Sequence, residues 1–306
     1  MQTETIQFNG WKSLKISNGI IDLVVTLDIG PRVARLGFVG QDNEFCEFPA
    51  QIGLKGGDEW HSYGGHRLWH APEVMPRTYY PDNFPVKMED HKTFIRFISD
   101  PEKGNNMQKE IDIELVEGKS QVKVTHRIRN LGLWPVQYAL WALSVMRTTG
   151  VAIVPIPERK PHGGNFVPSN LISIWPVTDM SDPRYTWGKQ FVLFKQDDNH
   201  GTPQKFGMTV PDGWGAYACK GHIFIKQISG QGGPGYTDNG CNFEFYNEAG
   251  MAELESLSPF QVVEPGQAAE HFELWTLLDG VPQPATEADV VNNVIPKIKE
   301  IVSKKL

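Results

Sequence analysis

Short apolar or alternating runs, broken at close intervals by Gly, Pro, Asn and Asp, dominate this chain of 306 residues. Such runs are typical of β-strands, and early examples lie at residues 20–26, 32–39 and 93–98. Strand-like runs recur every ~8–15 residues with few helical stretches between them, which favours antiparallel pairing over β-α-β units. The spacing therefore predicts an all-β fold, a large antiparallel β-sandwich.

A hairpin with a period of two is the clearest local pattern. Residues 109–116 and 121–129 are its predicted arms, joined by a Glu-Gly-Lys turn at 117–119. In the second arm, Val and Ile residues share one face with His126, while Lys, Thr and Arg residues share the other. A lone histidine on an apolar face is typically a hydrogen-bonded core residue, so this is the preferred interpretation of His126.

The one helix that we expect covers residues 286–305. Thr286 and Asp289 resemble an N-terminal capping box, and apolar residues then recur at i, i+3 and i+4. Pro296 lies inside this pattern and predicts a kink or a restart of the helix. No composition shift or linker divides the chain, so residues 1–306 are predicted to form a single β-sandwich domain that ends in this helix.

Charge and cysteine content exclude several classes of protein. The chain has 29 Lys and Arg against 36 Asp and Glu, with no basic block, which argues against a nucleic-acid partner. Its three cysteines are far apart and form no C-x-x-C, so neither a zinc ribbon nor a disulfide framework is indicated. We find no signal-peptide pattern and no membrane-spanning run. A cytoplasmic protein without a membrane partner, cofactor or metal is expected.

The densest group of polar and aromatic side chains lies at residues 58–73, which we expect to belong to a long loop over 55–76. This group suits a sugar, because flat aromatic rings cover the C–H side of a pyranose while Arg, His and Glu bond its hydroxyls. The candidate ligand-binding residues of this group are Trp60, His61, His66, Arg67, Trp69, His70 and Glu73.

The same segment allows two other interpretations. His61, His66, His70 and Glu73 could bind a metal ion, and His66 and His70, at i and i+4, would share a face on a helix. However, Gly64-Gly65 before them and Pro72 after them leave little room for a helix. The segment also fits a surface loop fastened by its tryptophans, in which the histidines only bond the local backbone.

A second group of candidates lies at residues 243–259. Glu253 and Glu255 would point to the same side of a strand, roughly 6.5–7 Å apart at the backbone. On a partly desolvated face, their repulsion raises the pKa of one carboxyl, which then becomes a usable general base near neutral pH. A solvated sheet face has the same pattern, and the residues alone do not decide between the two.

The C-terminal part of the chain resembles that of the galactose mutarotase-like superfamily. The resemblance lies in residues 252–259 and in residues 262–275, which hold a Pro-Gly turn and a Phe-Glu-Leu-Trp run. Residues 23–36 are similar to the opening strands of that superfamily, and the run at 64–73 is most similar to an uncharacterised branch of it. The resemblance covers about the whole chain and implies an aldose 1-epimerase-like sandwich.

The resemblance also implies roles for particular residues. In sugar mutarotases of this superfamily, a glutamate removes the proton of the anomeric hydroxyl while a histidine protonates the ring oxygen. By position Glu255 matches the base and Arg67 the arginine that binds sugar hydroxyls, with Glu253 and Trp141 beside the substrate. Trp141 stands where the family has its acid histidine, and an indole N–H only donates a hydrogen bond. The acid is therefore expected among His61, His66 and His70.

Three functions follow from these features, all with a carbohydrate as the partner, and a small-molecule carbohydrate is the one expected. The first is a sugar mutarotase or epimerase-like isomerase that acts on an aldose or a sugar derivative by general acid–base catalysis. The second is a polysaccharide lyase or a glycoside hydrolase-type enzyme. The third is a non-catalytic carbohydrate-binding module. Arg67 with Arg77 or Arg32 would favour a carboxylate or phosphate on the sugar, because a guanidinium group bonds either in bidentate fashion.

Overall fold

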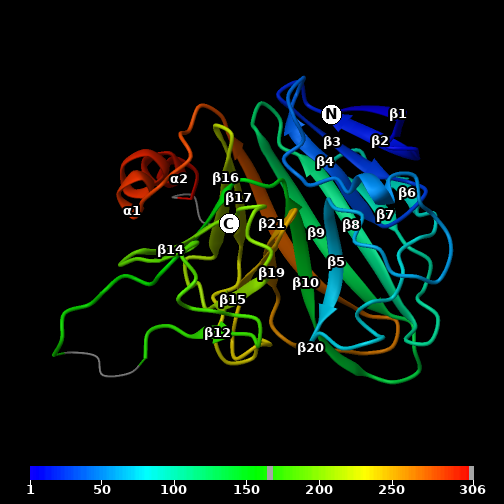
Figure 1. Ribbon diagram of the computed structural model, residues 1–306. Helices are drawn as coiled ribbons and strands as arrows, with labels where there is room; N and C mark the ends of the chain where they lie inside the picture. The colour runs from blue at the N-terminus through cyan, green and yellow to red at the C-terminus, as the bar shows by residue number, and fades with distance from the viewer. Residues whose placement is uncertain (164–167, 303–306) are drawn as a thin grey trace.

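The computed structural model describes residues 1–163 and 168–302, and two large β-sheets make up most of it (Figure 1). The strand order of the first sheet is β1-β2-β3-β4-β5-β10-β19-β18-β15-β12, and β20 pairs with β10 at its side. The strand order of the second sheet is β13-β14-β11-β16-β17-β21-β9-β8-β7-β6. Each of these neighbours is antiparallel to the next, so the predicted antiparallel sandwich is confirmed.

The bounds of the elements follow the strand-like runs of the sequence. The first sheet contains β1 (Gln2–Phe8), β2 (Trp11–Ser17), β3 (Ile21–Thr26), β4 (Arg32–Phe38), β5 (His66–Ala71), β10 (Val136–Met146), β12 (Ile172–Ile174), β15 (Gln204–Met208), β18 (Phe243–Glu248), β19 (Met251–Leu257) and β20 (Gln261–Val263). The second contains β6 (Lys87–Asp90), β7 (Ile95–Ile98), β8 (Met107–Leu115), β9 (Gln121–Asn130), β11 (Val151–Pro155), β13 (Tyr185–Trp187), β14 (Phe191–Lys195), β16 (Trp214–Cys219), β17 (His222–Ile228) and β21 (Ala268–Leu278). A short 3₁₀ turn covers Pro49–Gln51.

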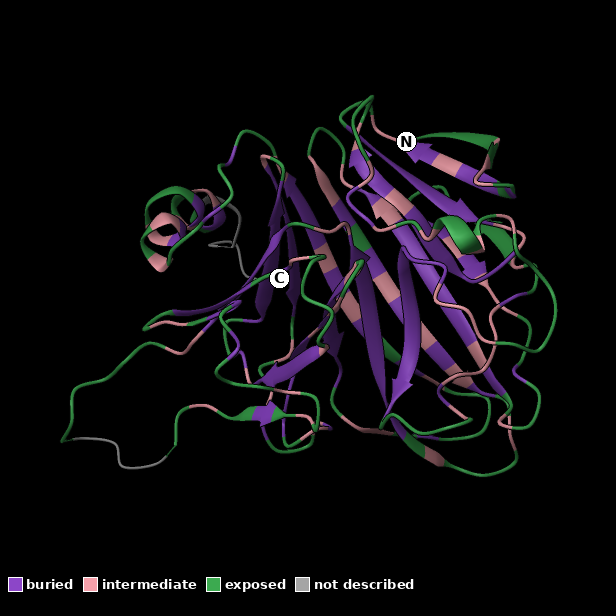
Figure 2. Ribbon diagram, in the orientation of Figure 1, coloured by how far each residue is buried: buried purple, intermediate pink, exposed green. Residues whose placement is uncertain are grey.

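Alternation of side chains along the strands builds the core between the two sheets. On β10, Tyr138 and Leu140 point into this core, whereas Ala139 and Trp141 belong to a separate cluster on the outer face of the first sheet. The strands β5 and β10 are nonetheless buried along almost their whole length, on both faces (Figure 2). An antiparallel sheet commonly leaves one face to water. The covered outer face therefore marks a part of the first sheet that loops enclose.

The predicted hairpin is present as β8 and β9, with Lys109 opposite Ile128. His126 is fully buried in the interior, as its apolar face indicates. The segment 55–76, expected to be one long loop, contains the strand β5 instead. This correction matters for the site, because a strand sends neighbouring side chains to opposite faces of the sheet.

The C-terminal helical segment packs on the outer face of the second sheet (Figure 1). Its capping box is present, since Thr286 Oγ1 accepts from Asp289 N and Asp289 Oδ2 accepts from Thr286 N. The segment consists of α1 (Glu287–Asp289), a π-helical turn (Val290–Val294) and α2 (Ile295–Val302), so the expected interruption occurs just before Pro296. Residues 303–305 of the predicted helix lie outside the described residues. No helix in the described ranges is long and apolar enough to span a membrane.

Candidate functional site

Five adjacent strands of the first sheet, in the order β5-β10-β19-β18-β15, carry the candidate site on their outer face. One line of directly paired residues runs across them from Arg67 through Leu143 and Glu255 to Glu244. Trp69 pairs with Trp141 one step away on the same face. Alternation thus places the predicted arginine, tryptophans and glutamates together, although they come from segments far apart in the sequence.

A pocket of about 360 Å³ opens over this face. Its volume lies within the range of roughly 300–1,000 Å³ that is usual for small-molecule sites. Aromatic and charged side chains dominate the wall, and the loops after β5 and before β18 close its sides. The lining residues are Pro72, Glu73, Val74, Met75, Tyr79, Trp141, Trp175, Lys205, Asp238 and Glu244.

Lys205 is the central cation of the pocket. Its Nζ lies 4.6 Å from the ring centre of Trp141 and 4.6 Å from that of Trp175, so it is held between two indoles. The same Nζ lies 2.9 Å from Glu244 Oε2 and 3.6 Å from Glu255 Oε2. Although burial opposes its charge, the carboxylates of Glu255 and Glu244 raise the pKa of Lys205 above its ordinary value. Lys205 is therefore a fixed ammonium group and a hydrogen-bond donor at neutral pH.

Glu255 lies beneath this pocket and is fully buried. Its Oε2 accepts the indole N–H of Trp141 over 2.8 Å. Burial raises the pKa of Glu255 to about 7, against the lowering effects of Lys205 and of the Trp141 hydrogen bond. Trp141 and Lys205, which both contact Glu255, line the pocket, whereas Glu255 itself does not. Glu255, the predicted base, thus lies directly beneath the residues that line the pocket, and its surroundings raise its pKa.

Arg67 and Glu253 form a buried ion pair beside Glu255. Arg67 Nη1 lies 2.7 Å from Glu253 Oε1, and both side chains are almost completely buried. The guanidinium carbon lies 4.4 Å from the ring centre of Trp69 and 5.8 Å from that of Trp60. Arg67 is therefore oriented by an ion pair and by stacking on two of the predicted tryptophans.

The loops above β5 complete an aromatic cluster. Trp60 lies 5.4 Å from Trp69 and 5.2 Å from Tyr79, measured between ring centres. The Tyr79 hydroxyl donates a hydrogen bond to Glu73 at the pocket wall. Trp60 and Trp69 thus support the site from its side, while the rings that face the pocket are those of Tyr79, Trp141 and Trp175.

Two of the three candidate histidines point away from this face, and the third does not line the pocket. His66 and His70 alternate with Arg67 and Trp69 along β5, so they point to the opposite side, between the two sheets, and are 0 % and 1 % exposed. The ring of His61 packs against Tyr63 in the loop before β5. The expectation that the acid beside Glu255 is His66 or His70 is therefore corrected, because it assumed a loop where the chain forms a strand, and His61 is not among the residues that line the pocket.

His66 instead belongs to a buried network between the sheets. Its Nε2 is hydrogen-bonded to His126 Nε2 over 2.7 Å, and its Nδ1 to Ser144 Oγ over 2.9 Å. His126 Nδ1 is hydrogen-bonded to the carbonyl of His271 over 3.1 Å. Burial lowers the pKa of His66 and His126, so both rings are neutral at physiological pH.

His66, His126 and Glu273 are also the group within the described ranges whose ligand atoms lie close enough to hold a metal ion, within 4.8 Å of one another. The two histidine nitrogens already bond each other, and the ammonium of Lys226 lies 3.1 Å from Glu273 Oε1. Against the effect of burial, Lys226 lowers the pKa of Glu273 to about 2. A buried ammonium beside the carboxylate opposes a second cation, so this group fits a hydrogen-bonded network better than a metal site.

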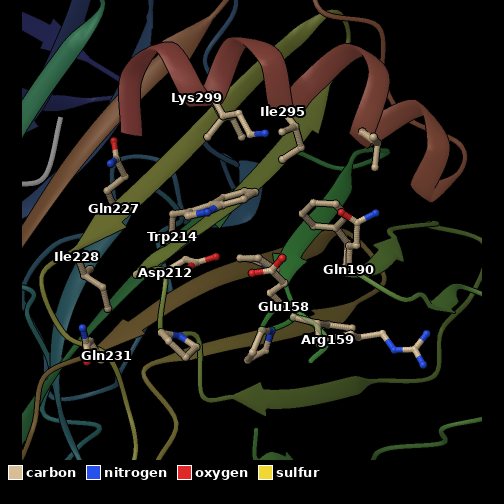
Figure 3. Close-up of a pocket in the computed structure, with 18 of the residues that line it drawn as sticks. Glu158, Arg159, Gln190, Asp212, Trp214, Gln227, Ile228, Gln231, Ile295 and Lys299 are labelled. Carbon is tan, nitrogen blue, oxygen red and sulfur yellow. The ribbon is translucent and has the colours of Figure 1, made fainter. Parts of the chain in front are cut away.

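A second, larger cavity of about 1320 Å³ lies between the outer face of the second sheet and the C-terminal helix (Figure 3). Trp214 and Ile295 lie on opposite walls of this cavity, while Glu158, Arg159 and Lys299 surround it. All of its charged side chains are solvent-exposed, and none of the predicted site residues lines it. The smaller pocket, in contrast, is lined by buried and mutually oriented charges, Lys205 and Glu244, and we therefore treat it as the site.

Several residues that line the pocket were not predicted from the sequence: Tyr79, Trp175, Lys205, Asp238 and Glu244. Lys205 and Glu244 come close to Glu255 only because β15, β18 and β19 are adjacent, which brings together residues about 10 to 50 positions apart. Glu244 stands in the 243–259 segment, and alternation with Phe243 and Phe245 is the signal that places it opposite the core. A single sequence does not show which strand lies beside which.

Comparison with solved structures identifies the class of fold. A candidate aldose 1-epimerase from Klebsiella pneumoniae superposes with a TM-score of 0.62 at 14 % identity, over 99 % of this chain and 86 % of that chain. A galactose mutarotase-like protein from Lactobacillus casei superposes with a TM-score of 0.55 at 9 % identity, over 87 % of this chain and 100 % of that chain. No family model and no curated protein sequence matches the chain. The chain therefore has the galactose mutarotase-like fold.

The same fold occurs as part of a longer protein. A TPR-domain containing protein from Parabacteroides distasonis superposes with a TM-score of 0.57 at 12 % identity over 90 % of this chain. The present chain spans about half of that protein, since 50 % of its length is covered. At such identities the likeness defines the fold, and the chemistry has to be argued from the site itself.

Proposed function

We propose that the protein binds an aldose or a neutral aldose derivative in the pocket over β10, β18 and β19 and interconverts its anomers by general acid–base catalysis. The proposal rests on one observation: Glu255 contacts Trp141 and Lys205, and both of these residues line the pocket. A carboxyl group with a pKa near 7, oriented by an indole N–H and an ammonium group, suits proton transfer at physiological pH. The fold, shared with mutarotase-like proteins, supports the same assignment.

The reaction needs little beyond proton transfer. The anomeric hydroxyl loses its proton, the ring oxygen gains one, the ring opens, and closure on the other face gives the second anomer. Tyr79, Trp141 and Trp175 offer aromatic faces for the C–H side of the sugar, and Lys205 and Glu244 offer a donor and an acceptor for its hydroxyls. No redox or covalent step is required of these residues.

Non-catalytic carbohydrate binding is the second candidate, and the burial of Glu255 favours it. Glu255 has no exposed surface, and its contact with the pocket passes through other side chains. In a binding module of this kind, Glu255 would only orient Trp141 and Lys205. Sugar binding would then depend on the aromatic wall and be almost independent of the ionisation of Glu255.

Anomer exchange tests the two candidates. Purified protein is expected to accelerate the exchange of some aldose, followed by NMR or polarimetry, across hexoses, pentoses, uronic acids and sugar phosphates. Glu255→Gln should lose this acceleration at pH 7, whereas Glu114→Gln should keep it. Glu114 is a partly exposed residue of β8 that pairs with Lys123, so it controls for the Glu-to-Gln change itself.

Binding measurements separate the remaining outcomes. If calorimetry detects a sugar whose anomers the protein does not exchange faster, and Trp175→Ala weakens binding while Glu255→Gln does not, the protein is a binding module. New reducing ends or unsaturated uronates from polysaccharides would instead identify a hydrolase or a lyase. Either result would contradict the mutarotase proposal.

A further inference from the structure

Glu244 on β18 and Glu255 on β19 lie directly opposite each other in an antiparallel pair, on the same face of the sheet. Directly opposed residues in such a pair have Cα atoms about 4.5–5.5 Å apart, so their side chains are neighbours. Both are buried, with Glu244 2 % and Glu255 0 % exposed. Two carboxyl groups are thus held side by side where bulk water does not separate them.

The ammonium group of Lys205 lies close to both carboxyl groups, since its Nζ contacts one oxygen of each. Lys205, Glu244 and Glu255 thus form a trio of charged groups. With both carboxyls ionised, the trio carries a net charge of −1, and one proton on either carboxyl makes it neutral. Burying an uncompensated charge is strongly unfavourable, and two adjacent carboxylates do not both ionise readily. The neutral arrangement, with one proton for two carboxyls, is therefore favoured.

Within the described part of the chain, the charged groups that face the trio from neighbouring elements do not offer a second free cation. Arg67 on β5 is engaged by Glu253, and Lys226 from the second sheet is engaged in the buried network between the sheets. Glu73 and Asp238, from the loops at the pocket wall, add negative charge. The surroundings therefore strengthen the preference for a shared proton.

Hydrogen bonding distinguishes the two carboxyl groups. Trp141 donates to Glu255 Oε2, and a donor of this kind favours the charged form of its acceptor. Each carboxyl also has one buried oxygen, Oε1, without a hydrogen-bond partner among the described residues, so the Trp141 bond is what separates the two. Burial also raises the pKa of Glu244 well above its ordinary value. The proton is thus favoured on Glu244, which lines the pocket, and the negative charge on Glu255, which does not.

We propose that Glu244 and Glu255 share one proton at neutral pH, and that Glu244, which holds it at the pocket wall, is the catalytic residue that exchanges protons with the bound sugar. Glu255 is then a positioning residue that acts through Glu244. The inference rests on the proposed function for its substrate, a cyclic aldose, whereas the shared proton follows from the geometry of the pair.

One carboxylic acid can serve both oxygens of a cyclic hemiacetal, because O1 and O5 are bonded to the same carbon. The Glu244 O–H gives its proton to O5 as the C1–O5 bond breaks, and its carbonyl oxygen takes the O1 proton as the C1–O1 double bond forms. Ring closure after rotation of the aldehyde reverses both transfers. Glu244 is protonated before and after, so no separate acid is needed where Trp141 replaces the histidine of the resembling family.

The pH dependence of two variants tests this assignment. Glu244→Gln is expected to lower kcat about 100-fold or more at every pH, the size of a lost acid–base group. Glu255→Gln removes the neighbouring negative charge, so Glu244 pairs alone with Lys205 and ionises at lower pH. Its activity should be lost at pH 7 and return as the solution is acidified. Loss of activity at every pH in Glu255→Gln, with activity kept in Glu244→Gln, would overturn the proposal.

A readout without substrate separates this inference from the proposed function. The infrared spectrum of the wild type at pH 7 should contain the carbonyl band of a protonated carboxyl, and the difference from Glu244→Gln should isolate it. Circular dichroism and thermal unfolding of both variants, with Glu114→Gln as the control, show that they fold. Absence of the band would overturn the inference even in an active mutarotase. Presence of the band without anomer exchange for any sugar would overturn only the catalytic role and the proposed function.

Discussion

The indole N–H of Trp141 donates to Glu255 Oε2 over 2.8 Å, and this bond links the aromatic wall of the pocket to the buried carboxyl beneath it. The sequence resemblance matches Trp141 to the position of the acid histidine in sugar mutarotases. Trp141 donates a hydrogen bond but transfers no proton, so its role is to orient Glu255 and to favour the charged form of that carboxyl.

Replacing Trp141 by Phe tests this role. The substitution removes the N–H donor and keeps most of the apolar volume, so the pKa of Glu255 is expected to rise further above 7. Because a hydrogen bond to a charged group contributes about 1.5–3 kcal/mol, the free energy of unfolding should fall by about that amount at alkaline pH, where Glu255 is ionised. Urea unfolding at pH 6 and pH 9 measures the change. An equal loss at both pH values would show that the bond does not depend on the charge of Glu255.

The stability of the fold should also depend on the protonation of Glu255. Its pKa in the folded chain, about 7, lies above its ordinary value of 4.5, so the folded protein holds a proton that the unfolded chain releases. The stability that this group contributes is complete below pH 4.5 and is lost as the pH rises to about 7. Relative to the wild type, Glu255→Gln should therefore become more stable across this window.

Denaturant titrations at closely spaced pH values provide the measurement. The variant Glu114→Gln carries the same chemical change at a partly exposed site and should run parallel to the wild type. A difference between wild type and Glu255→Gln that stays constant from pH 4.5 to pH 7 would show that Glu255 titrates at its ordinary pKa in the folded chain.

Much of the fold could be predicted from local pattern, because the alternation of strand residues and the turn residues between strands are local features of the sequence. The hairpin of β8 and β9 and the shared face of Glu253 and Glu255 are examples. The alternation that places Glu253 and Glu255 on one face of β19 also separates His66 and His70 from Arg67 on β5. Once 66–71 is a strand, His66 and His70 must face away from Arg67, and only the loop assignment had kept them together.

The rest of the site depends on strand neighbours, which local pattern does not specify. Lys205 reaches Glu255 only because β15, β18 and β19 are adjacent, and Glu244 meets Glu255 only through the register of β18 and β19. A one-residue slip of that register would send Glu244 to the opposite face. The pairing of Glu244 with Glu255 therefore depends on tertiary structure and could not be predicted from the sequence alone.

Charge in the pocket predicts a preference for neutral sugars. The carboxylates of Glu73 and Asp238 line the wall, where the one lining cation, Lys205, is already paired with the Glu244 and Glu255 carboxyls. The arginines expected to bind an anionic group are not among the residues that line the pocket, and Arg32 and Arg67 pair with Asp82 and Glu253. A carboxylate or phosphate on the ligand would therefore face like charges, which is strongly unfavourable in a desolvated site.

Thermal-shift screening with matched pairs of ligands measures this preference. Glucose and galactose should raise Tm more than glucuronate, galacturonate or the corresponding sugar phosphates at equal concentration. Glu73→Gln, which removes one negative charge from the wall, should narrow the difference. Tighter binding of a sugar phosphate than of its parent sugar would contradict this prediction.

The buried ion pair of Lys226 and Glu273 should determine whether the two sheets stay together. Lys226 Nζ also donates to the carbonyl oxygens of Ala142 and Leu254, over 3.1 and 3.0 Å, so it ties the second sheet to two central strands of the first. Removing one partner of a buried pair leaves the other charge uncompensated, so Lys226→Met and Glu273→Gln should each cost about 3–5 kcal/mol of unfolding free energy. The double variant has no unpaired charge and should recover part of this loss. Denaturant unfolding of the wild type, the two single variants and the double variant gives the coupling free energy of the pair. Strictly additive losses of unfolding free energy would show that Lys226 and Glu273 are not coupled.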